Sequence, residues 1–155
     1  MNKTCYITGH TKGIGKSLYD HFIALDWKVT GYNSATGLSN VIKEAAGCDL
    51  FINNAYADGI QIDLLNQLYD SVGQMIVCGS IVTDYPDPML PEYTKHKQEL
   101  EKRVLELSTH SSILLLKLSG HAYNNPKEVI SIIDYWLTNP TISVVAFKSI
   151  GEPNR

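Results

Sequence analysis

The sequence lacks any apolar run long enough to cross a membrane as a helix. Its longest purely aliphatic stretch covers residues 113–116, whereas a transmembrane helix needs about 20 apolar residues. It also lacks an excess of one charge, because 13 basic and 16 acidic side chains give a net charge of −3. This balance gives no reason to expect binding to nucleic acid or to an anionic membrane surface.

Cysteine and histidine are too few and too scattered to suggest a metal site. The three cysteines, at positions 5, 48 and 78, are odd in number, and none has the spacing of a metal-binding pair. The five histidines include no pair four residues apart. We therefore expect no metal, and we expect buried thiols in a reducing cytoplasm. The first apolar stretch leads directly into a glycine-rich turn at residue 9, which leaves no room for a signal peptide.

What the sequence does contain is a regular alternation of two patterns. Apolar runs typical of strands occur at 3–8, 27–32, 49–55, 74–80, 112–118 and 141–148. Between them, apolar residues recur at helical spacing in 14–25, 39–46, 61–72, 92–109 and 126–138. This alternation predicts an α/β fold with a doubly wound, Rossmann-like parallel sheet covered by helices on both faces. The length of 155 residues and the absence of a linker predict one three-layer domain over residues 1–155.

The first predicted strand is followed by a glycine-rich turn, the segment Thr8–Gly15 with the sequence TGHTKGIG. The backbone N–H groups at the start of a helix have no partners within the helix, and the helix dipole makes this end positive. Glycines let the backbone turn sharply and approach a phosphate without a side chain in the way. The spacing predicts a dinucleotide-binding turn, although a tight turn without a ligand would use the same glycines.

Small and polar residues also follow the other predicted strands. Because ligands of such sheets bind at the carboxyl ends of the strands, we expect these residues to line one cleft. They are Asn33 and Ser34 after the second strand, Asn53, Asn54, Ala55 and Tyr56 after the third, and Ser80 after the fourth.

Tyr93 and Lys97 lie four residues apart near the start of the long helix, so they share one face of it. A phenol has a pKa of about 10, and a nearby ammonium group favours the phenolate and lowers that pKa. Such a tyrosine can donate or accept a proton at neutral pH, and Ser80 can donate a hydrogen bond to a carbonyl oxygen that becomes negative. A Tyr-x-x-x-Lys pair also occurs by chance on solvent-exposed helices, so the pair alone leaves that alternative open.

Together these features resemble the short-chain dehydrogenase/reductase family. The TGxxxGIG turn at 8–15, the NNA segment at 53–55 and the set Ser80, Tyr93 and Lys97 occur in the order found in that family. The resemblance extends over the whole chain, which would be an unusually short member. It implies an NAD(P)-dependent enzyme that transfers a hydride between nicotinamide and a small carbonyl or alcohol substrate.

The resemblance also implies a role for each matching residue. Tyr93 would be the catalytic acid/base, Lys97 would bind the nicotinamide ribose and lower the pKa of Tyr93, and Ser80 would position the substrate carbonyl. The cofactor would be bound by Gly9, Thr11, Lys12, Gly13, Ile14, Gly15, Asn33, Ser34, Asn53, Asn54, Ala55, Tyr93 and Lys97.

The chain departs from the family pattern at several positions. It is shorter between residues 37 and 49, between 55 and 74, and after 120, and Tyr56 replaces the glycine of the family's NNAG motif. Only residues 121–125 separate the last turn from the predicted helix at 126, so we expect no lid over the substrate. The family's fourth catalytic residue, an asparagine, has no match. Asn66 is too close to Ser80, and we interpret it as a structural helix residue.

The end of the second predicted strand favours NADP(H) over NAD(H). NAD-specific members carry an acidic residue there, which binds the ribose hydroxyls. The residues Tyr32, Asn33 and Ser34 are neutral and would not repel a 2′-phosphate. The ammonium group of Lys12 could pair with that phosphate, although an unpaired solvent-exposed lysine is the alternative.

The predicted helices 61–72 and 92–109 carry more apolar residues than one sheet-facing stripe requires. Members of the family pair these helices in dimers, so we expect a homodimer or homotetramer; the alternative is that both helices only pack on the sheet. The residues concerned are Leu64, Leu65, Leu100, Val104, Leu105 and Leu107.

Two other functions stay under consideration. The chain lacks the lid and the catalytic asparagine of the family, so it could instead be a protein that binds a dinucleotide without catalysing a reaction. A nucleotide-sugar epimerase or dehydratase is disfavoured, because no substrate domain follows the glycine-rich turn.

Overall fold

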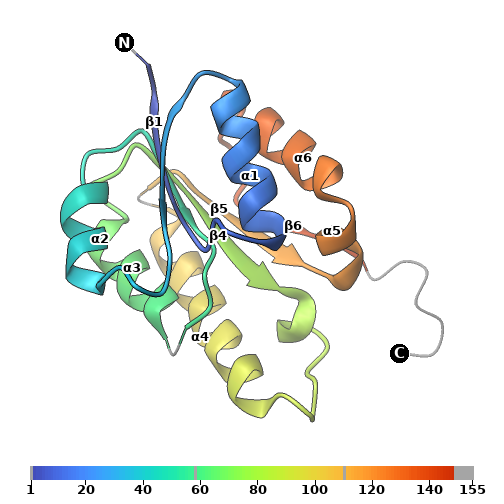
Figure 1. The fold of residues 1–155 in the computed structure, drawn as a ribbon. Coiled ribbons are helices and arrows are strands. Elements are labelled where there is room, and N and C mark those ends of the chain that lie inside the picture. Colours follow the sequence, from blue (N-terminus) through green and yellow to red (C-terminus); the bar gives the residue numbers. More distant parts are fainter. Residues whose placement is uncertain (1, 58, 110, 149–155) are drawn as a thin grey trace.

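The computed structural model describes residues 2–57, 59–109 and 111–148. Its six strands form one parallel sheet in the order β2-β1-β3-β4-β5-β6 (Figure 1). The strands are β1 (Thr4–Thr8), β2 (Lys28–Tyr32), β3 (Leu50–Asn53), β4 (Gln74–Ser80), β5 (Ile113–Leu118) and β6 (Val144–Ala146). The helices are α1 (Gly13–Ala24), α2 (Leu38–Ala45), α3 (Ile60–Leu68), the 3₁₀ turn η1 (Ile81–Thr83), α4 (Pro91–Leu107), α5 (Gly120–Asn124) and α6 (Pro126–Thr138).

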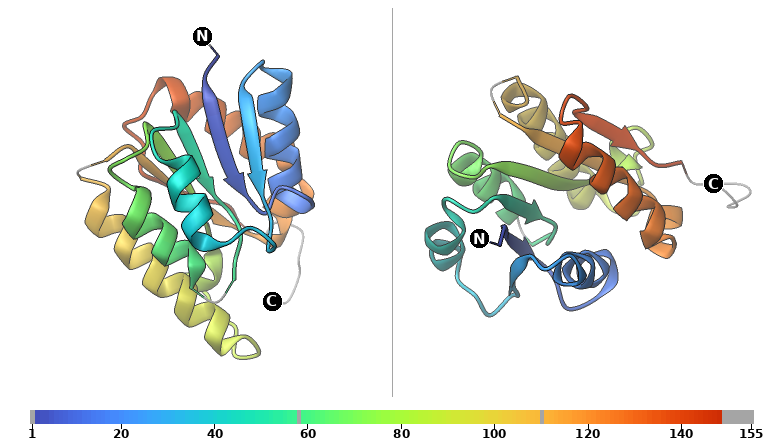
Figure 2. Two further views of the ribbon diagram at one scale, coloured as in Figure 1. Left: turned by 60° about the vertical axis from the view of Figure 1, so that its left-hand side comes forward. Right: turned by 90° about the horizontal axis from the view of Figure 1, so that it is seen from above.

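Helices cover both faces of the sheet, with α1 and α6 on one face and α2, α3 and α4 on the other (Figures 1 and 2). Successive strand side chains point to opposite faces, so the central strands are apolar at consecutive positions. On β5, for example, Leu114 and Leu116 pack in the core beneath α1 and α6, while Ile113 and Leu115 pack beneath α3 and α4. The predicted three-layer Rossmann-like fold is therefore confirmed. No helix among the described residues is long and apolar enough to span a bilayer.

The strand order places a switch point between β1 and β3. The chain passes from β1 to β2 on one side and then returns to β3 on the other side of β1. Rossmann sheets carry a further strand outside the one that corresponds to β2. Here only α2 lies between β2 and β3, so the predicted shortening between residues 37 and 49 removes that outer strand. Ligands of open α/β sheets bind at such a switch point, beside the carboxyl ends of the strands.

Several predicted boundaries differ from the structure. Helix α3 ends at Leu68 rather than at 72, and β6 covers only Val144–Ala146 of the predicted strand 141–148. The connection before residue 126 was predicted without a helix, but it forms the short helix α5, because the Ser119 hydroxyl caps it by accepting a hydrogen bond from the Ala122 N–H (3.2 Å). Residues 149–155 of the predicted domain lie outside the described residues.

Most of the apolar residues that suggested an oligomer are buried within the chain. Leu105 is half exposed, and the other five pack against the sheet. The outer surface of α3 and α4 carries a polar contact, in which Arg103 Nε donates to Asn66 Oδ1 at 2.6 Å. Asn66 makes this surface contact, and its structural role stays a prediction. The homo-oligomer also stays a prediction, and of the six residues that suggested it only Leu105 is half exposed. The residues concerned are Leu64, Leu65, Leu100, Val104, Leu105 and Leu107.

Candidate active site

The glycine-rich turn between β1 and α1 is tied to the end of β3. The Thr8 hydroxyl accepts hydrogen bonds from the N–H groups of Asn54 (3.0 Å) and Ala55 (3.1 Å). In return, the Asn54 side-chain amide donates to the carbonyl oxygens of Thr8 and Gly9, both at 3.1 Å. Gly9 has a φ of +71°, a backbone conformation that glycine adopts without strain. Asn54, which the sequence suggested as a cofactor contact, therefore holds the turn in shape.

The start of α1 has the properties of an anion site. A Cβ at Gly15 would lie 1.9 Å from the Gly9 carbonyl oxygen, so only glycine allows the turn to approach the helix this closely. No side chain of the described residues caps this helix, and no acidic residue lies in its first turn. Ile14, which the sequence suggested as a cofactor contact, is buried in the core beneath the turn, and Lys12 is exposed at the N-cap position. The first N–H groups of α1 thus have no side-chain cap, and they lie at the positive end of the helix dipole.

The end of β2, beside this turn, is neutral. Asn33 and Ser34 are exposed, and Asn33 Oδ1 accepts a hydrogen bond from the Ala35 N–H at 2.9 Å. The ring of His10 lies over Gly31, where a Cβ would come within 2.2 Å of its Cγ. His10 Nδ1 also lies 3.3 Å from the Tyr32 carbonyl oxygen. The turn residue His10 therefore borders the end of β2, the region where the adenosine part of a dinucleotide binds in this fold.

Ser80, the last residue of β4, has a free proton to donate. Its hydroxyl oxygen caps η1 by accepting a hydrogen bond from the Val82 N–H at 3.1 Å. Its own hydrogen is therefore available for another acceptor, and its side chain lies close enough to that of Tyr93 to lower the pKa of the phenol. The structure thus brings together the serine and the tyrosine that the sequence placed thirteen residues apart.

Tyr93 is half-buried at the start of α4, and its ring packs edge-to-face on that of Tyr56 at a centroid distance of 5.0 Å. Burial raises the pKa of Tyr93 above its ordinary value, and this effect exceeds the lowering caused by the neighbouring Ser80 side chain. The prediction of a lowered pKa is therefore wrong for this structure, because desolvation of the phenol outweighs its neighbours. Tyr93 carries its proton at neutral pH and is suited to act as an acid.

Lys97 is buried below Tyr93, with 3% of its surface exposed. Its Nζ donates to Gln61 Oε1 at 2.7 Å and to the Cys78 carbonyl oxygen at 3.0 Å, and it lies 5.5 Å from the centre of the Tyr93 ring. Two of its three N–H groups are thus used inside the protein, which leaves one for another acceptor. Burial lowers the pKa of Lys97 to about 8.

Gln61 holds this lysine, and the sequence analysis missed it. Its side-chain amide donates to the carbonyl oxygens of Asn53 and Cys78, both at 3.0 Å, while its Oε1 accepts from Lys97. Asn53 is fully buried, and its side chain donates to the Gln61 carbonyl oxygen at 2.8 Å, so it supports α3 rather than facing the cleft. One signal was present: Gln61 lies four residues before Leu65 on the buried face of the helix.

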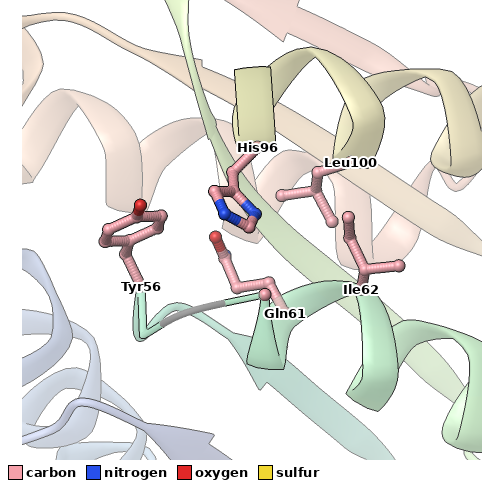
Figure 3. A pocket seen from close by; sticks show the side chains of 6 residues that line it. Tyr56, Gln61, Ile62, His96 and Leu100 are labelled. Atoms are coloured by element: carbon pink, nitrogen blue, oxygen red, sulfur yellow. The ribbon is translucent and has the colours of Figure 1, made fainter. Parts of the chain in front are cut away.

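A small hollow between α3 and α4 adjoins this network. It is lined by Tyr56, Gln61, Ile62, His96 and Leu100, together with Gly59 (Figure 3). In Figure 3 the His96 ring and the Gln61 side chain point toward one another across it. Gln61, already bonded to Lys97, thus borders the hollow on one side and the lysine on the other.

The fold is similar to that of several solved oxidoreductases. An alcohol dehydrogenase from Thermococcus sibiricus, complexed with 5-hydroxy-NADP, superimposes with a TM-score of 0.72 at 12% identity, over 100% of both chains. Serine dehydrogenase from Escherichia coli gives 0.73 at 13% identity, over 96% of this chain and 99% of the other. A short-chain dehydrogenase from Streptomyces avermitilis gives 0.76 at 12% identity, over 96% and 89%. At these identities the similarity shows a shared fold. No protein-family model and no curated protein matches the sequence.

Proposed function

We propose that this chain is an NADP(H)-dependent oxidoreductase of the short-chain dehydrogenase/reductase type, which acts on a small carbonyl or alcohol substrate. The observation that carries the proposal is the meeting of Ser80, Tyr93 and Lys97 at the carboxyl end of β4, in a fold shared with solved short-chain dehydrogenases. The protein has no separate substrate domain in the described residues, so the chemistry would take place at the edge of the sheet.

The glycine-rich turn fits a dinucleotide. Gly15 leaves room for close approach, and the uncapped start of α1 offers N–H groups to a diphosphate. Bound there, the nicotinamide cofactor supplies or accepts the hydride. Lys12 would pair with a 2′-phosphate, and the remaining N–H of Lys97 would be donated to the ribose. Of the residues that the sequence predicted to bind the cofactor, Asn53 and Asn54 support the site from within, Ile14 is buried beneath the turn, and Tyr93 is assigned to the proton transfer. The others are still proposed as cofactor contacts.

The chain's own residues would handle the proton. In carbonyl reduction the Tyr93 hydroxyl donates its proton to the carbonyl oxygen, while the Ser80 hydroxyl donates a hydrogen bond to the same oxygen. Lys97 provides a positive charge beside the phenolate that forms, and Gln61 keeps that charge in place. In alcohol oxidation the same groups act in reverse, with the phenolate of Tyr93 as base.

The direct test is to titrate the protein with NADPH and NADH by fluorescence, and then to follow NADPH oxidation with a panel of aldehydes and ketones. Saturable binding and turnover of at least one carbonyl compound would support the proposal. Tight binding without turnover across the panel would instead favour a dinucleotide-binding protein without catalytic activity.

Carbonyl reduction should depend on pH through Lys97. The pKa of Lys97 is lowered to about 8, so the ammonium is present below that pH and is lost above it, while the raised pKa of Tyr93 keeps the phenol protonated over the same range. We expect kcat/KM for reduction to be constant between about pH 6 and 8, and then to fall about tenfold per pH unit. Steady-state rates with NADPH in a constant-ionic-strength buffer series measure this. A profile that stays flat to about pH 10 would contradict the assigned role.

Lys12 should determine the preference for NADP(H). A charge-assisted hydrogen bond contributes about 1.5 kcal/mol or more, so Lys12→Ala should weaken NADPH binding about tenfold or more and leave NADH binding nearly unchanged. Lys16→Ala is the matched control, because Lys16 is also exposed on this helix but is paired with Asp20 at 2.6 Å. Fluorescence titration of wild type and both variants with NADPH and NADH measures the six affinities. Tighter binding of NADH by the unmodified protein, or an equal loss for both nucleotides, would show that Lys12 does not contact a 2′-phosphate.

A further inference from the structure

A buried lysine lies in an otherwise apolar strand, outside the groups used so far. Lys117 is on β5, whose six residues are all buried, and only 8% of its side chain is exposed. Its Nζ forms ion pairs with Asp84 Oδ2 at 2.5 Å and Glu101 Oε1 at 2.9 Å. Burying an unpaired charge is unfavourable for folding, and here the buried ammonium group is paired with two carboxylates.

The two carboxylates belong to the two elements that carry the reacting side chains. Asp84 directly follows η1, the turn capped by Ser80, and its N–H donates to the Ile81 carbonyl oxygen at 2.9 Å. Thr83 also ties this turn to Ser80, because its hydroxyl donates to the Ser80 carbonyl oxygen at 3.1 Å. The side chain that Lys117 binds is therefore fixed to the same short turn as the Ser80 hydroxyl.

Glu101 lies on the same stripe of α4 as the tyrosine and the lysine of the site. Tyr93, Lys97 and Glu101 are spaced four residues apart, which places them one above another on a helix face. The link Glu101–Lys117–Asp84 thus runs from α4 across β5 to the turn after β4. The same helix and the same turn carry Tyr93 and Ser80, whose side chains lie near one another.

We infer that Lys117 is a positioning residue that holds the Ser80 turn against α4, so that the Ser80 and Tyr93 hydroxyls meet; this inference rests on the proposed oxidoreductase function. Without the ammonium group, Asp84 and Glu101 would face one another as two unpaired carboxylates. Like charges at close range repel, so the turn and the helix would move apart rather than relax in place. Cofactor binding would be unaffected, since the glycine-rich turn is attached to β1 and β3 instead.

The kinetic test uses variants outside the catalytic residues. Lys117→Met should lower kcat at least tenfold, while the dissociation constant for NADPH stays within twofold of wild type. The link from α4 to the turn needs both Asp84 and Glu101, so loss of either one breaks it. Asp84→Asn, Glu101→Gln and the double variant should therefore all lower kcat by the same factor. Arg103→Met, which removes another ion pair of α4 (Arg103–Glu106, 3.0 Å), is the control and should keep its rate. Losses that multiply in the double variant, or a Lys117→Met enzyme with normal kcat, would overturn the inference.

Amide hydrogen exchange tests the link Glu101–Lys117–Asp84 without measuring activity. In Lys117→Met and in Asp84→Asn, protection of the Val82 and Asp84 N–H groups should fall at least tenfold, while protection of Ile7 in β1 stays as in wild type. Unchanged protection at Val82 in both variants would overturn the inference. A wild-type protein without turnover, in which these variants still lose protection at Val82, would contradict the proposed function and leave the structural tie supported.

Discussion

Tyr93→Phe is expected to lose at least a hundredfold in kcat for carbonyl reduction and to bind NADPH as tightly as wild type. The substitution removes only the hydroxyl, so the ring can still pack on Tyr56, and Lys97 keeps its bonds to Gln61 and to the Cys78 carbonyl oxygen. General acid catalysis by a positioned side chain typically contributes 10²- to 10⁴-fold, which sets the size of the expected loss. Single-turnover and steady-state rates, with NADPH affinity measured in parallel, give both quantities.

Tyr135→Phe is the matched control for this experiment. Tyr135 is an exposed tyrosine on α6, and its loss of a hydroxyl should leave kcat and NADPH affinity unchanged. If Tyr93→Phe retained more than a tenth of wild-type kcat, the phenol would not be the proton donor. If Tyr93→Phe lost NADPH binding as well, the residue would serve the cofactor site rather than the chemical step.

Gly15→Ala is expected to weaken NADPH binding about a hundredfold and to lower thermal stability. The new Cβ would lie 1.9 Å from the Gly9 carbonyl oxygen and 2.6 Å from Asn54 Nδ2, so the turn must move away from the helix. Overpacking of this kind typically costs 1–3 kcal/mol, and about 1.4 kcal/mol corresponds to a tenfold change in affinity. The displaced backbone is the part of the turn that would contact a diphosphate, so affinity falls together with stability.

Gly37→Ala separates this effect from the general cost of replacing a glycine. Gly37 has a φ of −68°, and the nearest atom to a Cβ there would be Asn40 Nδ2 at 3.8 Å. This variant should bind NADPH as wild type does. Because Gly37 is the N-cap of α2, where alanine is less favourable than glycine, its unfolding temperature should fall slightly. Wild-type NADPH affinity in Gly15→Ala would mean that the dinucleotide does not bind at the glycine-rich turn.

The fold could be predicted from the sequence because the patterns that indicate it lie within single strands, helices and turns. The apolar runs at β3, β4 and β5 are continuous since both faces of those strands are buried, and the glycine spacing follows from the close contact between Gly9 and Gly15. The order of Ser80, Tyr93 and Lys97 predicted that they would come together, since the carboxyl end of β4 and the start of α4 meet at one edge of the sheet.

The contacts of the residues that support the site, Gln61 and Lys117, could not be predicted from the sequence. Periodicity assigns Gln61 and Lys117 to buried faces, but it does not say that Gln61 binds Lys97 or that Lys117 joins Asp84 to Glu101. The direction of the Tyr93 pKa was mispredicted for a related reason, because it depends on how much of the phenol is buried, and a Tyr-x-x-x-Lys pattern contains no information on burial.

In the proposed mechanism Tyr93 lies beside the nicotinamide ring of a nucleotide bound at the start of α1. A crystal structure of the protein with NADPH tests it most directly and needs no knowledge of the substrate. We expect the diphosphate on the N–H groups of the turn between Gly9 and Gly15, with the nicotinamide facing the hydroxyls of Tyr93 and Ser80. A nucleotide bound at another edge of the sheet, or a Tyr93 hydroxyl turned away from the nicotinamide, would contradict it.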